Sequence, residues 1–195
     1  ATAEFIGHRA RGATGSDPYA YVQMGVDLAT RGTPLHNFPI YAANYQLPIA
    51  WYPYVHVGYH PPINSAGDAP TVWSFGGSLA YAFALRIFGE EGLDWVNPVF
   101  SILCAVAIAM LAREIFPNVQ FSLFNVRRPV SNVQTPTSNF QPLISALSAF
   151  LWLTSSTVVA WAVVPMVDTQ ATLFSILAIY FSLRAAHESI RRSSI

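Results

Sequence analysis

The sequence contains no lysine, so arginine supplies all ten of its basic residues. Ten acidic residues balance them, and the formal net charge is zero. A protein that binds nucleic acid through its phosphates needs an excess of positive charge, which this composition does not provide. We therefore do not expect nucleic acid among the partners.

Charge of either sign is also scarce. Only 10% of the 195 residues are charged, whereas 53% are hydrophobic and 14% are aromatic. Soluble domains average about 25% charged residues. A chain with so little charge cannot cover a surface that faces water, so we expect the lipid bilayer itself to be a partner of this protein. The one cysteine, Cys104, can form no disulfide within the chain, and its apolar neighbours predict that it packs as a small hydrophobic residue.

Nucleotide-binding glycine loops, a serine-hydrolase elbow and clusters of cysteine with histidine are all missing from the sequence. These absences argue against a nucleotide enzyme, a serine hydrolase and a zinc protein. The five histidines fall in predicted loops or at a helix end, which disfavours direct ligation of a pigment.

Three long apolar runs are present, at 95–113, 143–164 and 168–187. Each has about the 20 residues that a helix needs to cross a bilayer. A fourth run, 71–88, is shorter, contains two adjacent glycines and includes Arg86, which favours a helix lying in the membrane interface. The sequence thus predicts an all-α integral membrane protein with about three transmembrane helices, an interfacial helix, and an outer loop segment with short helices.

Arginine placement predicts the orientation, because short cytoplasmic loops are enriched in Lys and Arg. Such residues flank the loop 114–142 and follow the last span: Arg113, Arg127, Arg128, Arg184, Arg191 and Arg192. We therefore expect the loop 114–142 to be cytoplasmic, residues 1–92 to form an outer, periplasmic or extracellular segment, and residues 93–195 to form the membrane region. The polar start of the chain lacks a secretory signal pattern, so we expect a segment of a longer protein.

The stretch "GSDPYAY" places Asp17 between a glycine and Pro18, where an amphipathic segment begins that extends to Arg31 and stops at Gly32. An aspartate followed by a proline is a common helix start, with Asp17 as the N-cap and Pro18 at the first helical position. The competing hypothesis is a catalytic carboxylate. The local sequence favours the cap.

Residues 37–62 are rich in tyrosine, tryptophan and proline, which predicts an ordered loop. Its aromatic side chains are suited either to stacking on sugars or to contact with lipid headgroups. His56 and His60 have a spacing that binds zinc when a helix presents both rings, but the surrounding prolines make a paired metal site improbable here.

Asp168 opens the third apolar run, with Thr169 beside it. It is either an N-cap that interacts with the helix dipole or a functional acid at the membrane surface. The predicted topology places Asp17 and Asp168 on the same outer face. We therefore expect the two carboxylates to approach each other.

The order of several short motifs resembles the GT-C class of membrane glycosyltransferases, and is similar to protein O-mannosyltransferases and aminoarabinose transferases. The motifs are "SDPYAYVQMGVDLATRG", "YHPP", "LRIFGEEG", "LAREIF" and "PMVDTQATLFSILAIY". The resemblance covers the N-terminal part of that family only, since its first span, its later spans and its C-terminal region have no counterpart here. His60 also stands where a lysine is common.

The resemblance implies an enzyme of the bacterial plasma membrane that transfers a sugar, with inversion, from a polyprenyl-phosphate donor to a hydroxyl acceptor. Asp17 would be the general base, and His60, Tyr19 and Tyr21 would contact the substrate. Asp168 would hold a divalent metal that offsets the charge of the leaving phosphate. The alternative is a non-catalytic scaffold subunit, derived from such a transferase, that binds other membrane subunits in a larger complex.

Overall fold

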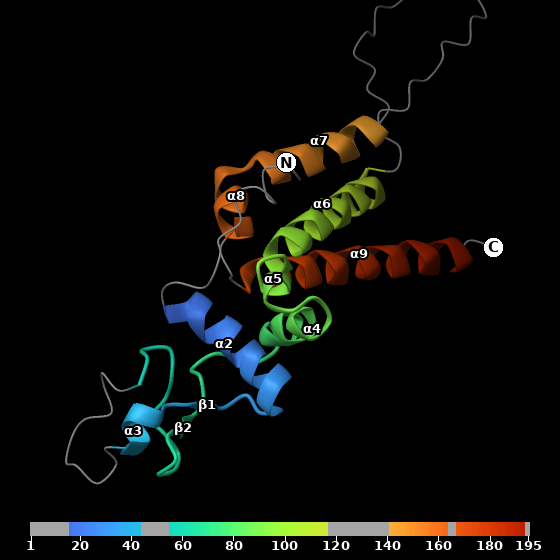
Figure 1. Cartoon of the computed structure of the whole chain (residues 1–195). Helices are drawn as coiled ribbons and strands as arrows, with labels where there is room; N and C mark the ends of the chain where they lie inside the picture. Colours follow the sequence, from blue (N-terminus) through green and yellow to red (C-terminus); the bar gives the residue numbers. More distant parts are fainter. Residues whose placement is uncertain (1–15, 44–54, 117–140, 164–166, 194–195) are drawn as a thin grey trace, which may run out of the picture.

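The computed structural model describes residues 16–43, 55–116, 141–163 and 167–193, and these are mostly helical. In Figure 1 the predicted outer segment occupies the lower half; it contains α2, α3, α4 and a small two-stranded sheet, which we call the hairpin. Helices α6 to α9 occupy the upper half. The predicted all-α class is therefore confirmed at the level of helix content. The departure from it is a two-stranded sheet in which β1 (His36–Asn37) pairs antiparallel with β2 (Asp68–Ala69).

Helix α2 (Ser16–Arg31) begins two residues before Pro18, the predicted first helical residue. Asp17 therefore lies in the first turn instead of capping the helix, and the prediction of an Asp17 N-cap is wrong. Pro18 is still tolerated, because the first N–H groups of a helix have no partner within it. The predicted stop is confirmed, since Gly32 has a φ of 69°, the left-handed conformation that follows many helices.

Between α2 and α4 the chain forms a small aromatic core around the hairpin. Its buried residues are Ala20, Val55, Tyr59 and Ala69, and Tyr19, Phe38 and Tyr41 pack against them. The short helix α3 (Pro39–Ala43) and an isolated bridge between Tyr59 and Thr71 belong to the same region. Residues 44–54 of the predicted aromatic loop lie outside the described residues.

Helix α4 (Ser78–Phe88) is shorter than the predicted 71–88, because residues 71–77 have no helical backbone. Two glycines precede it, and the hydroxyl of Thr71 donates to the carbonyl of Trp73 at 2.8 Å, a local bond that competes with helix formation. Gly89, with a φ of 71°, ends α4. The single turn α5 (Glu90–Leu93) then leads into α6.

Helix α6 (Val96–Ile115) matches the first predicted span closely. Together with α5 it forms the stretch Glu90–Ile115, which is long and apolar enough to cross a membrane by length and composition. It is the one such stretch among the described residues. The loop that follows, predicted at 114–142, falls mostly on residues 117–140, which lie outside the described part of the chain.

The second predicted span, 143–164, is not one helix. It consists of α7 (Gln141–Thr154) and α8 (Ser156–Val163), separated at Ser155. Consecutive serines and threonines compete with the helical backbone at this point. Thr154 Oγ1 donates to the carbonyl of Phe150 at 2.8 Å, and the Ser155 N–H is shared between the carbonyls of Leu151 and Trp152.

Helix α9 (Asp168–Ser193) is longer than the third predicted span and lies beside α6 (Figure 1). Near its start, Cys104 Sγ contacts the carbonyl oxygen of Thr169 at 3.3 Å, and near its end His187 Nδ1 lies 2.7 Å from Glu114 Oε1. Because both contacts join residues in the same order, α6 and α9 run parallel. Cys104 is buried and free, as predicted.

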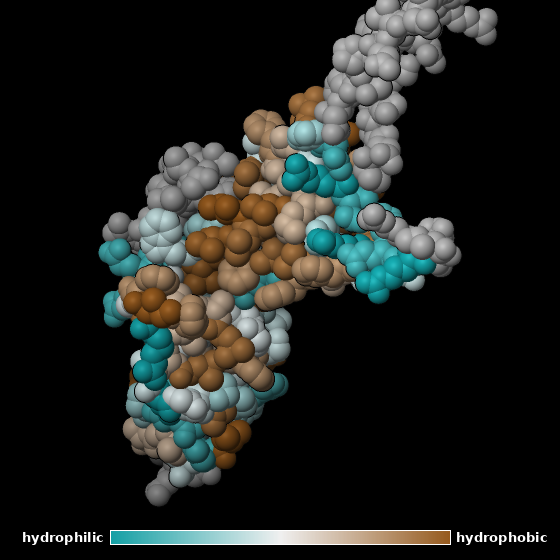
Figure 2. Space-filling view, turned by 90° about the vertical axis from the view of Figure 1, so that its right-hand side faces the viewer, coloured by the Kyte–Doolittle hydropathy of each residue, from teal (hydrophilic) through white to brown (hydrophobic). Residues whose placement is uncertain are grey.

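Large apolar side chains remain exposed on the helices. Figure 2 shows apolar residues across the middle of one face of the molecule. Those on α4, α6, α7 and α9 include Leu79, Phe83, Phe88, Leu103, Val106, Leu147, Phe150, Leu151, Phe174 and Phe181. Such a surface needs an apolar neighbour, which is either lipid or protein.

We predict that Gly25→Ala destabilises the contact between α2 and α4. A Cβ at residue 25 would lie 2.6 Å from Tyr81 Cβ and 2.9 Å from the Ser78 carbonyl oxygen, so the helices must separate. We expect a loss of about 1–3 kcal/mol, as for other overpacked sites. Thermal unfolding in detergent measures the loss. Gly76→Ala is the control, because nothing lies within 4 Å of its Cβ position, and equal melting of both variants would contradict the packing argument.

Candidate functional site

The two acids singled out from the sequence both lie within electrostatic range of Tyr21, whose side chain is buried. Burial raises the pKa of the Tyr21 hydroxyl, and the carboxylates of Asp17 and Asp168 raise it further. Both acids therefore lie within electrostatic range of one phenol, although one begins α2 and the other begins α9. Because its pKa is raised, Tyr21 stays protonated at neutral pH and is able to donate a hydrogen bond.

The neighbours of Tyr21 explain how α2 reaches α9. Tyr21 packs with Tyr81, Ala84 and Val96, and Val167 packs against this cluster from the start of α9. Gly77, just before α4, permits the approach, because a Cβ at that position would overlap the side chain of Val167. The site thus lies where α2, α4, α6 and α9 meet.

Asp168 also borders a cleft of about 640 Å³. The cleft lies between the α7–α8 break and the first turns of α9. Its lining is Ser148, Leu151, Trp152, Ser155, Thr157, Val158, Asp168, Thr169 and Thr172. Asp168 therefore has the outer segment on one side and this cleft on the other.

Tyr19 does not share the surroundings of Tyr21, because residues two apart on a helix point to nearly opposite sides. Its ring lies 4.6 Å from that of His56 and 6.4 Å from that of Tyr59, measured between centroids. Burial raises the pKa of Tyr19, with a further contribution from Asp27. The structure therefore places Tyr19 in the hairpin core, separate from the Asp17 and Asp168 pair.

His60 is exposed in the hairpin segment, and its backbone N–H donates to the carbonyl of Pro70 at 2.9 Å. His56 is half-buried and packs on Tyr19. Among the described residues no group of three or more His, Cys, Asp or Glu side chains forms a potential metal site. Among the described residues, Asp168 therefore belongs to no such group.

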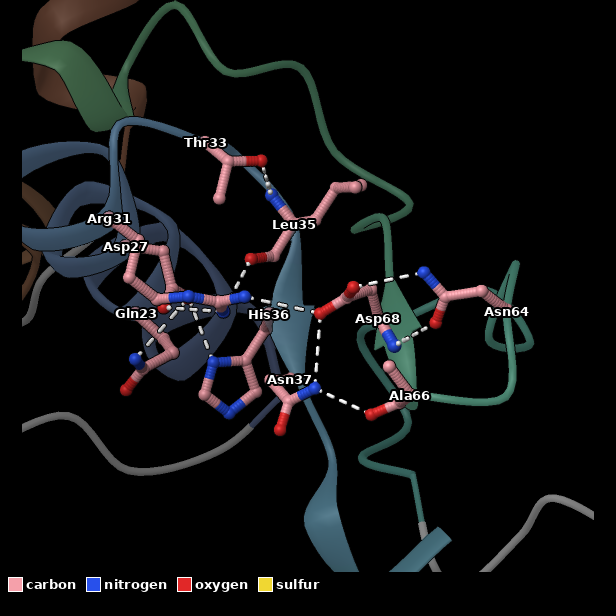
Figure 3. Close-up of polar contacts among 10 residues, drawn as sticks. All are labelled: Gln23, Asp27, Arg31, Thr33, Leu35, His36, Asn37, Asn64, Ala66 and Asp68. Carbon is pink, nitrogen blue, oxygen red and sulfur yellow. Dashed lines mark hydrogen bonds and ion pairs between the residues drawn. The ribbon is translucent and has the colours of Figure 1, made fainter. Parts of the chain in front are cut away.

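A network around Asp27 was not predicted from the sequence (Figure 3). Asp27 is only 3% exposed, and its carboxylate oxygen Oδ2 lies 2.8 Å from His36 Nδ1. Arg31 Nη1 is 3.4 Å from Asp27 Oδ1, and Gln23 donates to the other oxygen at 3.4 Å. The i,i+4 spacing of Asp27 and Arg31 in the sequence is typical of an ion pair on a helix. The contact of Asp27 with His36 on β1 forms only when the chain folds and has no such signal in the sequence.

Arg31 joins this network to the second strand of the hairpin. Its Nη2 lies 3.1 Å from Asp68 Oδ1, and Nη1 donates to the carbonyl of Leu35 at 3.0 Å. Hydrogen bonds from Asn64 and then Asn37, followed by Arg31, hold the pKa of Asp68 below its usual value. The carboxylates of Asp27 and Asp68 therefore fix α2, β1 and β2 to one another.

An aspartate beside a histidine can orient a catalytic base, but the surroundings of His36 point to a structural role. Its ring centroid lies 4.8 Å from that of Phe38, 5.6 Å from Tyr59 and 6.4 Å from Tyr19. These rings enclose the imidazole on several sides. Asp27 is thus best described as an anchor, whereas Asp17 and Asp168 are less buried and Asp168 borders a cleft.

Comparison of the chain with protein-family models, with curated proteins and with solved structures found no match.

We predict that Asp27→Ala strongly weakens the outer segment, because it leaves His36 and Arg31 without their buried carboxylate. Hydrogen bonds to charged groups contribute about 1.5–3 kcal/mol, and we expect a loss of this size. Thermal unfolding and limited proteolysis of residues 33–77 measure it. Glu188→Ala is the matched control, since it removes an exposed i,i+4 pair with Arg184 that is worth about 0.3–0.5 kcal/mol. Equal losses in the two variants would refute the anchoring role.

Proposed function

We propose that the protein is a membrane glycosyltransferase of the GT-C type. It transfers a sugar from a polyprenyl-phosphate donor to a hydroxyl acceptor, with Asp17 as the general base. The observation that carries the proposal is that the start of α9 meets α2 at Tyr21: Val167, next to Asp168, packs against the cluster of Tyr21, which lies one helical turn after Asp17. The family order of motifs predicts two acids at one outer site, and this contact supports that arrangement.

The chemistry divides between the two carboxylates. An ionised Asp17 accepts the proton of the acceptor hydroxyl as its oxygen attacks the anomeric carbon. The leaving phosphate gains charge at the same time and requires donors or a cation. Asp168 is the residue that would hold a divalent cation through its hard oxygen atoms. Tyr21, protonated at neutral pH, is suited to donating to a substrate oxygen, and His60 is a further donor in the outer segment.

We also propose three membrane crossings, by α6, by α7 with α8, and by α9, with α4 in the interface. The parallel contact of α6 and α9 supports this, because two neighbouring parallel helices require a return crossing between them. The exposed apolar side chains on α4, α6, α7 and α9 support it too, since lipid would cover them. The break at Ser155 makes the return crossing discontinuous.

The proposed orientation places the C-terminal ends of α6 and α9 in the cytoplasm and residues 1–92 outside. The contact between Glu114 and His187 brings those two ends together, so Arg113 and Arg184 lie toward the same side. A bacterial plasma membrane is the location that suits a polyprenyl-phosphate donor. Tyr19, placed in the hairpin core, would then act by shaping the outer segment.

We predict that a cysteine at residue 65 and a cysteine at residue 128 are reached from opposite sides of the membrane. Ser65→Cys is exposed in the outer segment, so a membrane-impermeant maleimide should label it in intact cells. Arg128→Cys should react only after permeabilisation. The wild type gives the background, since Cys104 is buried. Labelling of both variants from one side would rule out the topology.

We predict that Asp17→Asn abolishes transfer while the fold survives. The amide cannot accept a proton at neutral pH, and a general base contributes about 10²–10⁴ in rate. Loss of the charge in the first turn of α2 costs only about 0.3–1 kcal/mol. The assay is sugar transfer from a polyprenyl-phosphate donor in proteoliposomes, with the melting temperature measured in parallel.

Glu90→Gln is the control for this variant, because it removes an exposed carboxylate from α5. Its transfer rate should equal that of the wild type. Equal transfer by Asp17→Asn would exclude Asp17 as the base. A stable wild type that transfers no sugar from any donor would favour the non-catalytic scaffold subunit of a larger complex.

A further inference from the structure

A second pocket lies where α4 ends and the apolar stretch Glu90–Ile115 begins. Its volume of about 420 Å³ is within the range of small-ligand pockets. The residues that line it are Phe88, Glu91, Gly92, Trp95 and Val99. None of them takes part in the site proposed for sugar transfer.

Three of the lining residues follow one another along one side of this stretch. Glu91, Trp95 and Val99 are four residues apart, so each lies about one helical turn, or about 6 Å, further along the axis than the one before. The order is a carboxylate, an indole and then an aliphatic side chain. Leu103 and Val106 continue the same side and are 44% and 53% exposed, so the described helices leave them largely uncovered.

Phe88 supplies a second aromatic wall from the end of α4. It is the last residue of that helix and is 69% exposed. Gly92 lets α5 lie against α4 at this point. A Cβ at residue 92 would be 2.5 Å from the Ala84 carbonyl oxygen and 2.9 Å from Phe88 Cβ. The absence of that side chain therefore keeps Phe88 at the pocket that Trp95 also lines.

Glu91 gives the pocket its charge. Its carboxylate is exposed and forms no ion pair with another described residue. None of the lining residues is basic, and Arg86, the nearest arginine in the sequence, is not among them. The face of an aromatic ring attracts a cation, and so does a carboxylate. Two rings and one acid therefore favour an ammonium group, whereas an anion would meet Glu91 without compensation.

The membrane decides where such an ammonium group comes from. Tryptophan is enriched at the level of the lipid headgroups. If Trp95 lies at that level, Glu91 is nearer to water and Val99 nearer to the hydrocarbon. A phospholipid with an ammonium headgroup has the same order of charge, interface and apolar chain. The exposed Leu103 and Val106 then provide a surface for one of its acyl chains.

We propose that this pocket binds one phospholipid whose headgroup carries an ammonium group, as choline and ethanolamine lipids do. The ammonium contacts Glu91 and the faces of Phe88 and Trp95, and an acyl chain lies along Val99. A lipid held in this way fixes the start of the stretch at the headgroup level. The proposal rests on the membrane crossing proposed for α6 and not on sugar transfer.

The test uses the full chain in nanodiscs, with a bimane fluorophore attached to Leu103→Cys. This position lies on the same side of α6 as the pocket, and the native Cys104 is buried and should stay unlabelled. Lipids with brominated acyl chains quench the fluorophore when they lie beside it. Brominated phosphatidylcholine or phosphatidylethanolamine, mixed with unbrominated phosphatidylglycerol, gives the affinity of the ammonium lipids relative to the glycerol lipid.

We expect the ammonium lipids to bind beside residue 103 about fivefold more tightly than phosphatidylglycerol, as exposed cation–π contacts and ion pairs allow. Bimane on Phe174→Cys is the control for lipid in general. Phe174 is exposed near the start of α9 and does not line the pocket. The same mixtures should show no headgroup preference there.

Charge and ring variants identify the site, and all of them change exposed side chains. Glu91→Gln should lose most of the preference at residue 103, and Glu91→Arg should reverse it in favour of phosphatidylglycerol. Glu90→Gln is the matched control, because it removes the neighbouring carboxylate, which does not line the pocket. Phe88→Leu should also reduce the preference. Phe83→Leu, which changes an exposed phenylalanine of α4 outside the pocket, should keep it.

Four results would each overturn the lipid site and leave the membrane crossing in place. They are equal affinity for all three lipids at residue 103, the same preference at residue 174, an unchanged preference in Glu91→Gln, and an equal loss in Glu90→Gln. If no brominated lipid quenched the fluorophore at residue 103, the crossing by α6 would be refuted together with the lipid site. Sugar transfer enters none of these measurements.

Discussion

The parallel contact between α6 and α9 is the constraint on which the rest of the structure depends. Cys104, near the middle of α6, meets Thr169 at the start of α9, and Glu114 meets His187 toward the ends of both helices. Parallel neighbours require the chain to return between them, and α7 with α8 provides that return. The same contact fixes the N-terminus of α9, and with it Asp168, at the end of the bundle where the outer segment begins.

Small residues then allow the outer segment to reach Asp168. Gly25 lets α2 lie directly against Tyr81 and Ser78 of α4, and Gly77 lets the chain before α4 touch Val167. A side chain at either glycine would push these elements apart and disturb the cluster in which Tyr21 packs with Tyr81 and Val167. The site is therefore a product of close backbone approach as much as of the carboxylates themselves.

The sequence predicted the features that depend on hydrophobicity averaged over a long run or on the backbone preference of a single residue. The apolar run of α6 and the glycine that stops α2 were both found in this way. It did not predict the break at Ser155, because apolarity summed over a span does not register four neighbouring hydroxyl residues. The hairpin was also missed: strands of two residues carry no periodicity, and the contacts of Asp68 with Arg31 and Asn37 exist only after folding.

Three aspartates illustrate how surroundings assign different roles to one residue type. Asp27 is enclosed, and its two carboxylate oxygens contact His36 and Arg31. Its charge therefore serves to hold the hairpin against α2. Asp68 is held by two amides and an arginine, and its lowered pKa keeps it ionised in the same structural role. Asp17 and Asp168 are less buried, and both lie within electrostatic range of the Tyr21 phenol, whose pKa is raised mainly by burial. Carboxylates placed at an open junction, beside a neutral donor, are the ones able to exchange protons or ligands with a substrate. For this reason the proposed chemistry is assigned to the first turns of α2 and α9 and not to the network of Asp27 and Asp68.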